Sequence, residues 1–477
     1  MLKVFRHFLV VPVSLLAIAE TALFLVVITG LQAVGSRTFL ATNAPDVIRP
    51  YVVLFLTGLT FVCLAAAGLY NRDVFIEART FFQRAGVALL LVIFTALVIF
   101  PIYGLFDPVT VEWYLGLLSF TLLIHYPLMI VLRFGLVAFS GVDMFKRRVI
   151  VVGDGVLSGK VRQLIENRGQ AHLTSVGFIN RDTFSELAGK NEPVSEQGAL
   201  HNSTLGQDSA LLRFAIDNKV DEIVVASRER RGLPVWQLLQ CRMAGVAVTD
   251  YMTFWERESG EIDIDEVKPS WLALSDGFDR HWMRRAVKRL FDIVVSASFL
   301  IVVAPVMLIA ALFIKLESPG PVFYRQTRVG EGGRHFDIIK FRSMRVNAEQ
   351  DGVPQWAAKN DARVTRVGIV IRKLRIDEMP QILNVLKGEM SFIGPRPERP
   401  YFVDTLCAEI PLYAVRHNVK PGITGWAQVN YPYGASIDDA RRKLTFDLYY
   451  VKNENLFLDL VILLQTVRVV IMLAGSR

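Results

Sequence analysis

Long apolar runs dominate the first third of the chain. Four of them lie near residues 8–31, 51–70, 85–103 and 113–139, and each is close to or above the roughly 20 residues that a helix needs to cross a bilayer. The first run is too long for the apolar part of a secretion signal and no clear cleavage site follows it, so we interpret it as a retained helix. The pattern predicts four membrane-spanning helices over residues 1–145.

The lysine and arginine residues around these runs predict an orientation, because cytoplasmic loops of membrane proteins carry an excess of both. On one side the runs are flanked by Lys3, Arg6, Arg72, Arg79, Arg84, Lys146, Arg147 and Arg148. The loops on the other side hold only Arg37 and Arg49. Both ends of the bundle are therefore expected in the cytoplasm.

Two ionisable residues, Glu20 and His125, lie inside the predicted spans. Ionisable groups at membrane depth are costly and often functional. The alternative is a structural role in a buried pair or near the interface. We favour the structural role, because the sequence shows no partner for a functional relay.

The pattern changes after the fourth run to that of a mixed α/β domain. Short apolar runs at 148–152, 175–179 and 222–226 predict strands, with helical segments between them. Strands that alternate with helices indicate a parallel sheet, so we expect a Rossmann-like α/β domain over residues 146–255. Residues 256–283 are expected to form a linker.

A glycine turn follows the first of these strands, at Gly153, Gly155 and Gly159. Such a turn at a helix start can bind a phosphate. The spacing differs from the dinucleotide-binding pattern, and no acidic residue is clearly placed about 20 residues further on. A packing role without a ligand is therefore favoured over a bound dinucleotide.

A fifth apolar run, residues 293–314, opens the last part of the chain. Pro305 lies inside it and removes a helix hydrogen bond. Lysine and arginine residues precede and follow the run, which suits a helix that enters and leaves the cytoplasmic leaflet on one side. A simple span is the alternative. We favour a broken, re-entrant helix within a small α+β domain over residues 284–477, in which 456–473 forms an interfacial or packing helix.

Composition supports the membrane assignment. The chain of 477 residues is 52% hydrophobic and has a net charge of +8, a combination typical of membrane proteins with basic cytoplasmic faces. A basic stripe with interleaved aromatic residues is missing, so a nucleic-acid partner is not expected. The three cysteines, Cys63, Cys241 and Cys407, are far apart in sequence and indicate neither a disulfide framework nor a zinc site.

Charged residues that could take part in a reaction gather in the last domain. Asp377 and Glu378 are adjacent, with Arg372 and Arg375 before them and Pro380 after them, which predicts a helix start that stabilises ionised carboxylates. Further candidates are the cations Lys340, Arg342, Arg396 and Arg399 and the carboxylate Asp447.

Arginine forks match phosphate oxygens, and a carboxylate beside cations can act as a nucleophile or as a metal ligand. Together with the re-entrant helix, these residues indicate phosphoryl transfer to a lipid, with Mg²⁺ as the expected ion. The alternative is that the acid pair is an ordinary helix start with ordinary ion pairs.

Several longer motifs in this domain match a known family. They are Lys288–Asp292 before the fifth run, Ser318–Gln326 after it, Lys340–Met344, Asp377–Gln381, Ser391–Pro397, Pro421–Gln428, and Asp447 with Tyr449 and Tyr450. On these residues the chain resembles the polyprenyl-phosphate hexose-1-phosphate transferases, a family of bacterial sugar transferases, from about Arg284 to the C-terminus. The preceding bundle and α/β domain resemble the large members of that family, which include undecaprenyl-phosphate glucose and galactose phosphotransferases.

The resemblance implies a two-step reaction. Asp377 would attack the sugar-linked phosphate of a UDP-sugar, release UMP and form a covalent phosphosugar ester, which undecaprenyl phosphate then attacks. Glu378 would bind Mg²⁺. Phosphates would be bound by Lys340, Arg342, Arg372 and Arg396, and Asp447 would support the site. The chain would work in the bacterial cytoplasmic membrane, with its catalytic domain in the cytoplasm, and would start exopolysaccharide or glycan assembly.

Two departures from the family pattern stand in this chain. The helix break carries Ala304-Pro305 where the family often has Ser-Pro, so the serine hydrogen bond to the freed backbone is missing. Met379 replaces the usual leucine after the acid pair, which conserves volume.

A membrane-bound nucleotide-sugar dehydratase or epimerase and a non-catalytic assembly scaffold are the rival functions. The dehydratase or epimerase would need a Tyr-x-x-x-Lys pair, which the sequence lacks. The sugar stays open, and a homodimer is one arrangement that the sequence allows.

Overall fold

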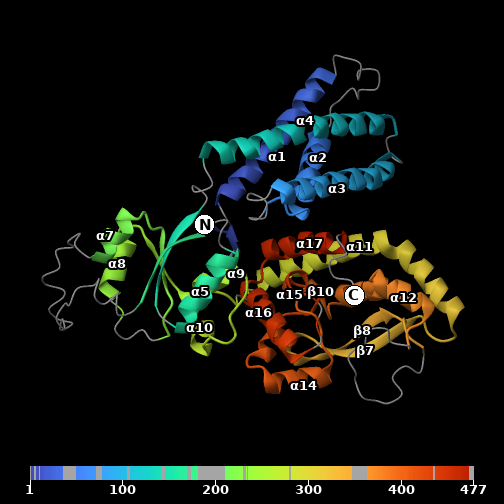
Figure 1. The fold of residues 1–477 in the computed structure, drawn as a ribbon. Helices are drawn as coiled ribbons and strands as arrows, with labels where there is room; N and C mark the ends of the chain where they lie inside the picture. Colours follow the sequence, from blue (N-terminus) through green and yellow to red (C-terminus); the bar gives the residue numbers. More distant parts are fainter. Residues whose placement is uncertain are drawn as a thin grey trace. The chain divides into compact units, whose positions relative to one another are not determined.

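The computed structural model divides into two compact units, Met1–Leu2 with Leu9–Ser259 and Lys3–Phe8 with Gly260–Arg477 (Figure 1). It describes residues 2–4, 7–9, 11–35, 50–70, 78–104, 108–140, 146–153, 155–168, 173–180, 210–228, 233, 235–278, 281–345, 363–432, 434 and 436–471. Arg6, Arg37, Arg49 and Arg72, which entered the orientation argument, lie outside these residues. The chain begins with two short paired strands, β1 (Leu2–Val4) and β2 (His7–Leu9).

Each of the four apolar runs forms a helix. The helices are α1 (Val11–Gly35), α2 (Pro50–Ala66), α3 (Ala78–Gly104) and α4 (Pro108–Ser140), and α1 packs on α2 and α4 while α3 packs on both α2 and α4. Within the described residues, α1 and α4 are long and apolar enough to cross a bilayer, whereas α2 and the clearly apolar part of α3 are shorter. Several apolar helices able to span a membrane are thus present, and the crossing of all four stays a prediction.

A buried ion pair holds the bundle together. Arg133 of α4 donates through Nε to one carboxylate oxygen of Glu20 and through Nη2 to the other at 2.8 Å, and its Nη1 donates to the Leu69 carbonyl at 3.1 Å. His125 Nε2 lies 3.3 Å from the Glu20 carbonyl oxygen. The buried pair that the structural alternative requires is therefore present, with Arg133 as the partner that sequence reasoning missed, and the role of Glu20 and His125 stays a prediction.

The α/β domain contains a four-stranded parallel sheet in the order β4-β3-β5-β6, as the alternating pattern predicts. Its strands are β3 (Arg147–Val152), β4 (Leu173–Ile179), β5 (Glu222–Val225) and β6 (Ala247–Asp250), and its helices are α5 (Gly155–Arg168), α7 (Ala210–Asp217), α8 (Val235–Met243) and α9 (Tyr251–Ser259). The assignment to a Rossmann-like fold stays a prediction. β6 was missed, because its four residues are only partly buried and form no apolar run.

The glycine turn after β3 is explained at one position by packing. Gly153 has a φ of +143°, and a Cβ atom built on it would lie 2.2 Å from the carbonyl oxygen of Ala226, just after β5. No such contact surrounds Gly159 in α5. A side chain at position 153 would therefore force the end of β3 away from β5. This packing requirement holds whether or not the turn also binds a phosphate.

The main part of the second unit starts at Gly260. Within the stretch expected to be a linker, Gly260 accepts a hydrogen bond from Trp426 Nε1 at 2.6 Å and the backbone N–H of Ile262 donates to Thr445 at 3.0 Å. The helices and strands that precede the acid pair are α10 (Pro269–Leu274), α11 (Trp282–Glu317), β7 (Phe323–Val329), η5 (Glu331–Gly333), β8 (His335–Phe341) and α12 (Arg366–Lys373). The remaining elements are η6 (Ile376–Gln381), α13 (Ile382–Lys387), β9 (Ser391–Ile393), α14 (Pro400–Glu409), η7 (Tyr413–Asn418), β10 (Gly422–Thr424), α15 (Trp426–Asn430), α16 (Ile437–Asn453) and α17 (Leu456–Ile471).

The fifth apolar run lies within α11, which continues through Pro305 and bends along its length (Figure 1). The expected interruption of the helix at Pro305 is therefore wrong in detail, because loss of one backbone hydrogen bond bends a helix without ending it. A straight helix of 36 residues would be about 54 Å long. Both ends of α11 nevertheless contact the same unit, since Arg289 donates to the carbonyls of Val385 and Leu386 and the Glu317 carboxylate accepts from the N–H of Arg366 at 2.7 Å.

Buried polar contacts fix the first half of α11 to the rest of the unit. The Asp292 carboxylate accepts from the Ser391 hydroxyl and from the Phe392 N–H, and Lys288 Nζ lies 2.7 Å from an Asp459 oxygen in α17. The Tyr450 hydroxyl donates to the same Asp459 carboxylate at 2.8 Å. α17 is thus a packing helix, as expected, because its acidic residue lies inside this cluster and is not exposed.

The close approach at Gly153 yields a stability prediction. We expect Gly153→Ala to destabilise the α/β domain by about 2–5 kcal/mol, the combined scale of backbone strain and overpacking. Hydrogen exchange of the β3 and β5 amides in the full chain measures this loss. Gly159→Ala is the matched control and should leave exchange unchanged or slow it, since alanine favours a helix interior. Equal protection in the two variants would show that position 153 has room for a side chain.

Candidate active site

The two adjacent acids lie in η6, a short 3₁₀ turn between α12 and α13. Arg375 precedes them with a left-handed backbone, φ 58° and ψ 19°, which is uncommon for a residue with a side chain. The expected geometry, an α-helix start with Pro380 in first position, is wrong, because Pro380 lies within η6 and α13 begins at Ile382. The charge of the acids is consequently balanced by side chains more than by helix N–H groups.

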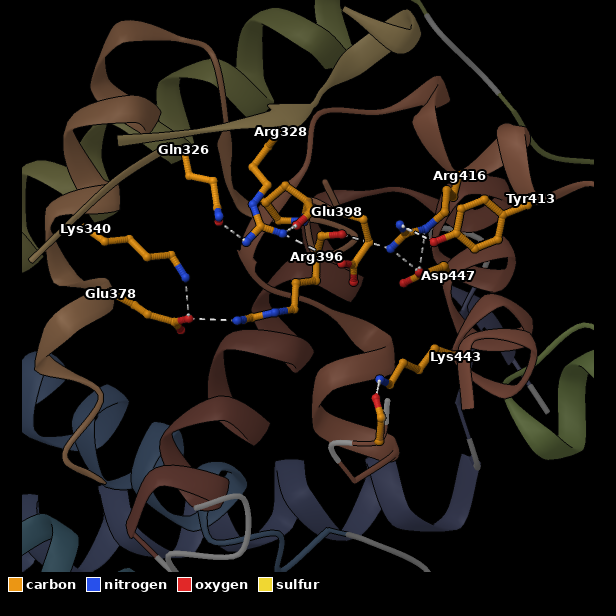
Figure 2. Close-up of polar contacts among 12 residues, drawn as sticks. Gln326, Arg328, Lys340, Glu378, Arg396, Glu398, Tyr413, Arg416, Lys443 and Asp447 are labelled. Carbon is orange, nitrogen blue, oxygen red and sulfur yellow. Dashed lines mark hydrogen bonds and ion pairs between the residues drawn. The ribbon is translucent and has the colours of Figure 1, made fainter. Parts of the chain in front are cut away.

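Glu378 is held by cations on two sides (Figure 2). Its Oε1 accepts from Lys340 Nζ at 3.0 Å and from Arg396 Nη2 at 2.7 Å, while Arg375 lies 3.9 Å from Oε2. Burial alone would raise the pKa of Glu378, but Arg396 and Lys340 outweigh it and hold the pKa well below its ordinary value. Glu378 is therefore ionised and fixed in position.

Asp377 has the opposite electrostatic environment. Its Oδ1 is buried and has no hydrogen-bond partner among the described residues. Burial, and then the charge of Glu378, raise the pKa of Asp377 to about 6, although Lys340, Arg372 and Arg375 act in the other direction. An ionised carboxylate without a hydrogen-bond donor is poorly stabilised, which makes it reactive toward an electrophile.

Lys340 lies on β8 and faces the acid pair. In the antiparallel β7–β8 hairpin it is paired with Tyr324, so it shares a face with Gln326 and Arg328, at alternate positions on β7. Burial lowers the pKa of Lys340 more than the neighbouring Glu378 raises it. The hairpin thus presents a row of polar side chains to the site.

Arg396 is aimed at Glu378 by a stiff turn, Gly394–Arg399, which carries two prolines. Arg328 holds this turn from β7, because its Nη1 donates to the Pro397 carbonyl at 3.2 Å and its Nη2 to Gln326 Oε1 at 2.6 Å. The N–H of Val329 donates to the Glu398 carbonyl at 3.0 Å. Three consecutive residues of the turn are therefore either in contact with the hairpin or pointed at Glu378 (Figure 2).

Asp447 lies behind the site and reaches it through Arg416. Arg416 donates through Nε and Nη2 to Asp447 Oδ2, at 3.0 and 2.8 Å, and through Nη2 to the Arg396 carbonyl at 2.9 Å. Burial raises the pKa of Asp447 despite the adjacent guanidinium. Its contacts give Asp447 a supporting role, in which it fixes the arginine that holds the backbone of Arg396.

The other two predicted cations occupy different places. Arg372 lies in the last turn of α12, where its charge favours the ionised form of Asp377. Arg342 is buried, and its guanidinium donates to the Ser318 and Pro319 carbonyls at 2.8 Å, at the end of α11. The contacts of Arg342 therefore support the end of α11, and the hydrogen bonds that it makes within the described residues do not reach the acid pair.

Sequence reasoning missed Glu398, which lies within the turn, and Arg328, Arg416 and Lys443, all of which are labelled in Figure 2. Lys443 donates to the Gly434 carbonyl at 2.6 Å, and burial lowers its pKa. For Arg328 a signal was present, because polar side chains recur at the alternate positions Gln326 and Arg328 and would share one face of a strand. Arg416 carried no such signal, since only the fold brings it beside Asp447.

The two acids are also the candidate metal ligands. Among the described residues, no group of three or more histidine, cysteine, aspartate and glutamate side chains gathers as a metal site would. Magnesium needs only one or two carboxylates when substrate phosphates supply further oxygens. The unpartnered Asp377 Oδ1, and Glu378 Oε2 with its single distant cation, are compatible with such a site.

The raised pKa of Asp377 yields a prediction on stability. An acid whose pKa is higher in the folded chain favours folding when protonated, so stability falls as pH rises from about 4 through 6. We expect Asp377→Asn to raise the free energy of unfolding above pH 6, by up to about 3 kcal/mol, and to have little effect near pH 4. Thermal unfolding in detergent at both pH values measures it. Asp404→Asn, at an exposed position, is the control. A loss of stability at pH 7 in the Asp377 variant would show that the pKa of Asp377 is not raised in the folded chain.

The sequence pattern of one family, described as bacterial sugar transferase, matches residues 283–473, the segment that contains the acid pair. The chain is 45% identical over 261 residues to a UDP-N-acetylgalactosamine-undecaprenyl-phosphate N-acetylgalactosaminephosphotransferase of Aeromonas hydrophila, covering 54% of this chain and 61% of that protein. The chain thus spans about three fifths of this relative.

Two further relatives match over larger shares of their own length. A UDP-glucose:undecaprenyl-phosphate glucose-1-phosphate transferase of Caulobacter vibrioides is 46% identical over 182 residues, 38% of this chain and 68% of that protein. The exopolysaccharide production protein PSS of Rhizobium leguminosarum is 42% identical over 194 residues, 39% of this chain and 95% of that protein. On this similarity, and on the matching pattern around the acid pair, the chain belongs to the bacterial sugar transferase family.

Proposed function

We propose that this chain transfers a hexose-1-phosphate from a UDP-sugar to undecaprenyl phosphate. The observation that carries the proposal is the contrast between two adjacent carboxylates, since Asp377 has a buried oxygen without a hydrogen-bond partner and Glu378 is fixed between Lys340 and Arg396. One carboxylate is left to react while the other keeps the cations in place. The names of the relatives support both substrates.

In the first step an oxygen of Asp377 attacks the sugar-linked phosphorus of the UDP-sugar. The bond from that phosphorus to the oxygen of UMP breaks, UMP leaves, and an aspartyl-phosphosugar is formed. In the second step an oxygen of undecaprenyl phosphate attacks the same phosphorus. The bond to Asp377 then breaks, which restores the carboxylate and releases the lipid-diphosphate sugar.

The surrounding residues stabilise the charge that moves in these steps. Lys340 and Arg396 both lie at Oε1 of Glu378, the neighbour of Asp377, and would stabilise a phosphate bound at the acid pair, while Arg372 adds positive charge that acts on Asp377. Mg²⁺ bound by Glu378, with Asp377 nearby, would neutralise non-bridging phosphate oxygens. Arg416 and Arg328 act through the turn, by keeping the backbone and side chain of Arg396 in position.

The second substrate is lipid-bound, which requires the site to face a membrane. The apolar side chains of α11 are exposed over much of its length, and both ends of the helix contact the domain that contains the acid pair. We infer that α11 enters the cytoplasmic leaflet and returns, and that the chain works in the bacterial cytoplasmic membrane. The product would start exopolysaccharide or glycan assembly. The relatives are named for different sugars, so the sugar is left to experiment.

The division of roles predicts unequal effects in the acid pair. Asp377→Asn should lower transfer of labelled sugar phosphate from UDP-sugars to undecaprenyl phosphate by at least about 10³-fold, because the nucleophile is lost. Glu378→Gln should leave a measurable rate and shift its dependence on Mg²⁺ concentration. Asp404→Asn is the control, and a panel of UDP-sugars assayed for UMP release identifies the sugar. Full activity of the Asp377 variant would rule out the covalent route.

The path of α11 can be tested separately. Single cysteines at Arg285, before the apolar part of the helix, and at Lys315, after it, should both react from the cytoplasmic face with a thiol reagent that cannot cross the membrane. The test requires replacement of the exposed Cys407 by serine first. Labelling of the two positions from opposite faces would establish a simple span and exclude the re-entrant path.

A further inference from the structure

A pocket of about 460 Å³ lies away from the acid pair, lined by Phe323, Arg325, Ile339, Leu383, Leu386 and Lys387. Arg325 and Ile339 are paired across the β7–β8 hairpin, next to the pair of Tyr324 and Lys340. Because successive side chains of a strand point to opposite faces, the pocket lies on the face of the hairpin opposite to Lys340. It is therefore separate from the candidate active site.

The first half of α11 contacts one wall of this pocket directly, and the second half reaches another wall through Phe341. Phe323 stacks on Phe341 with ring centroids 5.4 Å apart, and Phe341 packs against Ala310 and Ile314 in the second half of the helix. From the first half, Arg289 donates to the carbonyl of Leu386 at 2.6 Å. The pocket thus lies beside a helix that exposes apolar side chains over much of its length.

The outward surface of α11 sets the environment of the pocket. Ile301, Leu308 and Leu316 are 76%, 73% and 72% exposed, and such apolar surface is stable when it is covered by lipid. If α11 is inserted in the leaflet, as the proposed function requires, the pocket lies at the level where phospholipid headgroups meet the protein.

The lining of the pocket matches one class of ligand. Among the described residues that line it, Arg325 and Lys387 are the charged ones, and both are cations, while the other four are apolar. Basic pockets beside membrane helices on the cytoplasmic side bind anionic lipid headgroups. An inorganic phosphate would leave the four apolar residues uncovered, and a sugar would find few hydrogen-bonding groups in the lining. A phospholipid matches both parts of the lining, because its phosphate can contact the two cations and its glycerol and acyl chains can cover the four apolar residues.

We propose that this pocket binds the headgroup of an anionic bilayer phospholipid. Arg325 and Lys387 contact the phosphate, and Phe323, Ile339, Leu383 and Leu386 contact the glycerol and the start of the acyl chains. The bound lipid links the hairpin and α13 to the leaflet. It holds the opposite face of the hairpin, with Lys340, at a fixed depth relative to lipid-borne substrates.

The test uses the full chain in nanodiscs of phosphatidylcholine with one fifth phosphatidylglycerol, without any UDP-sugar. After mild detergent extraction, native mass spectrometry counts the retained lipids of each class per chain. The variant is the double substitution Arg325→Gln and Lys387→Gln. The control, Arg334→Gln with Lys373→Gln, removes the same charge at two other exposed positions, and thermal unfolding checks that each protein is folded.

We expect the ratio of retained phosphatidylglycerol to phosphatidylcholine to fall at least fivefold in the Arg325/Lys387 variant and to stay within twofold of the parent in the control. Equal retention in the variant and the parent would overturn the proposal. Displacement of phosphatidylglycerol by inorganic phosphate would reassign the pocket to a free anion, and displacement by an equimolar amount of undecaprenyl phosphate would reassign it to the acceptor. The binding assay involves no catalysis, so an inactive transferase would leave its result interpretable.

Discussion

Two adjacent carboxylates in a poorly hydrated turn cannot both be ionised without compensation, and the way this chain compensates them organises the whole C-terminal unit. The cations converge on Glu378, whose oxygen accepts from Lys340 and Arg396. Asp377 keeps a buried oxygen without a hydrogen-bond partner and a raised pKa. Because burial weakens the charged form and nearby cations restore it, the distribution of donors decides which acid is held and which is left reactive.

This asymmetry depends on a layered support. Asp447 fixes Arg416, and Arg416 holds the backbone of Arg396. On the other side, Arg328 holds the next residue of the same turn, Pro397. The backbone of the turn is therefore held at Arg396 and Pro397, while the Arg396 guanidinium extends to Glu378. A buried charge is tolerated when it is fully paired. Removal of its partner leaves the charge buried and uncompensated, which destabilises the folded protein.

The same hairpin that presents Lys340 to the acids turns its other face toward α11. One antiparallel pair of strands therefore connects the charged chemistry on one side with the apolar helix on the other, through the alternation of side chains. In the proposed arrangement, a lipid bound in the pocket beside α11 would hold in place the hairpin that carries Lys340. The N-terminal bundle and the α/β domain form a unit with its own ion pair and its own parallel sheet.

The apolar helices, three of the four strands of the α/β domain and the family could all be predicted from the sequence, because hydrophobic period and local motifs are properties of neighbouring residues. The sequence also indicated Asp377, Glu378, Lys340 and Arg396 as a set. Which cation meets which acid followed from the tertiary contacts, which also gave Arg342 and Asp447 supporting roles and revealed Arg133 as the partner of Glu20. Those contacts join residues 18 to 113 positions apart, and distance along the chain removes any local pattern that could have predicted them.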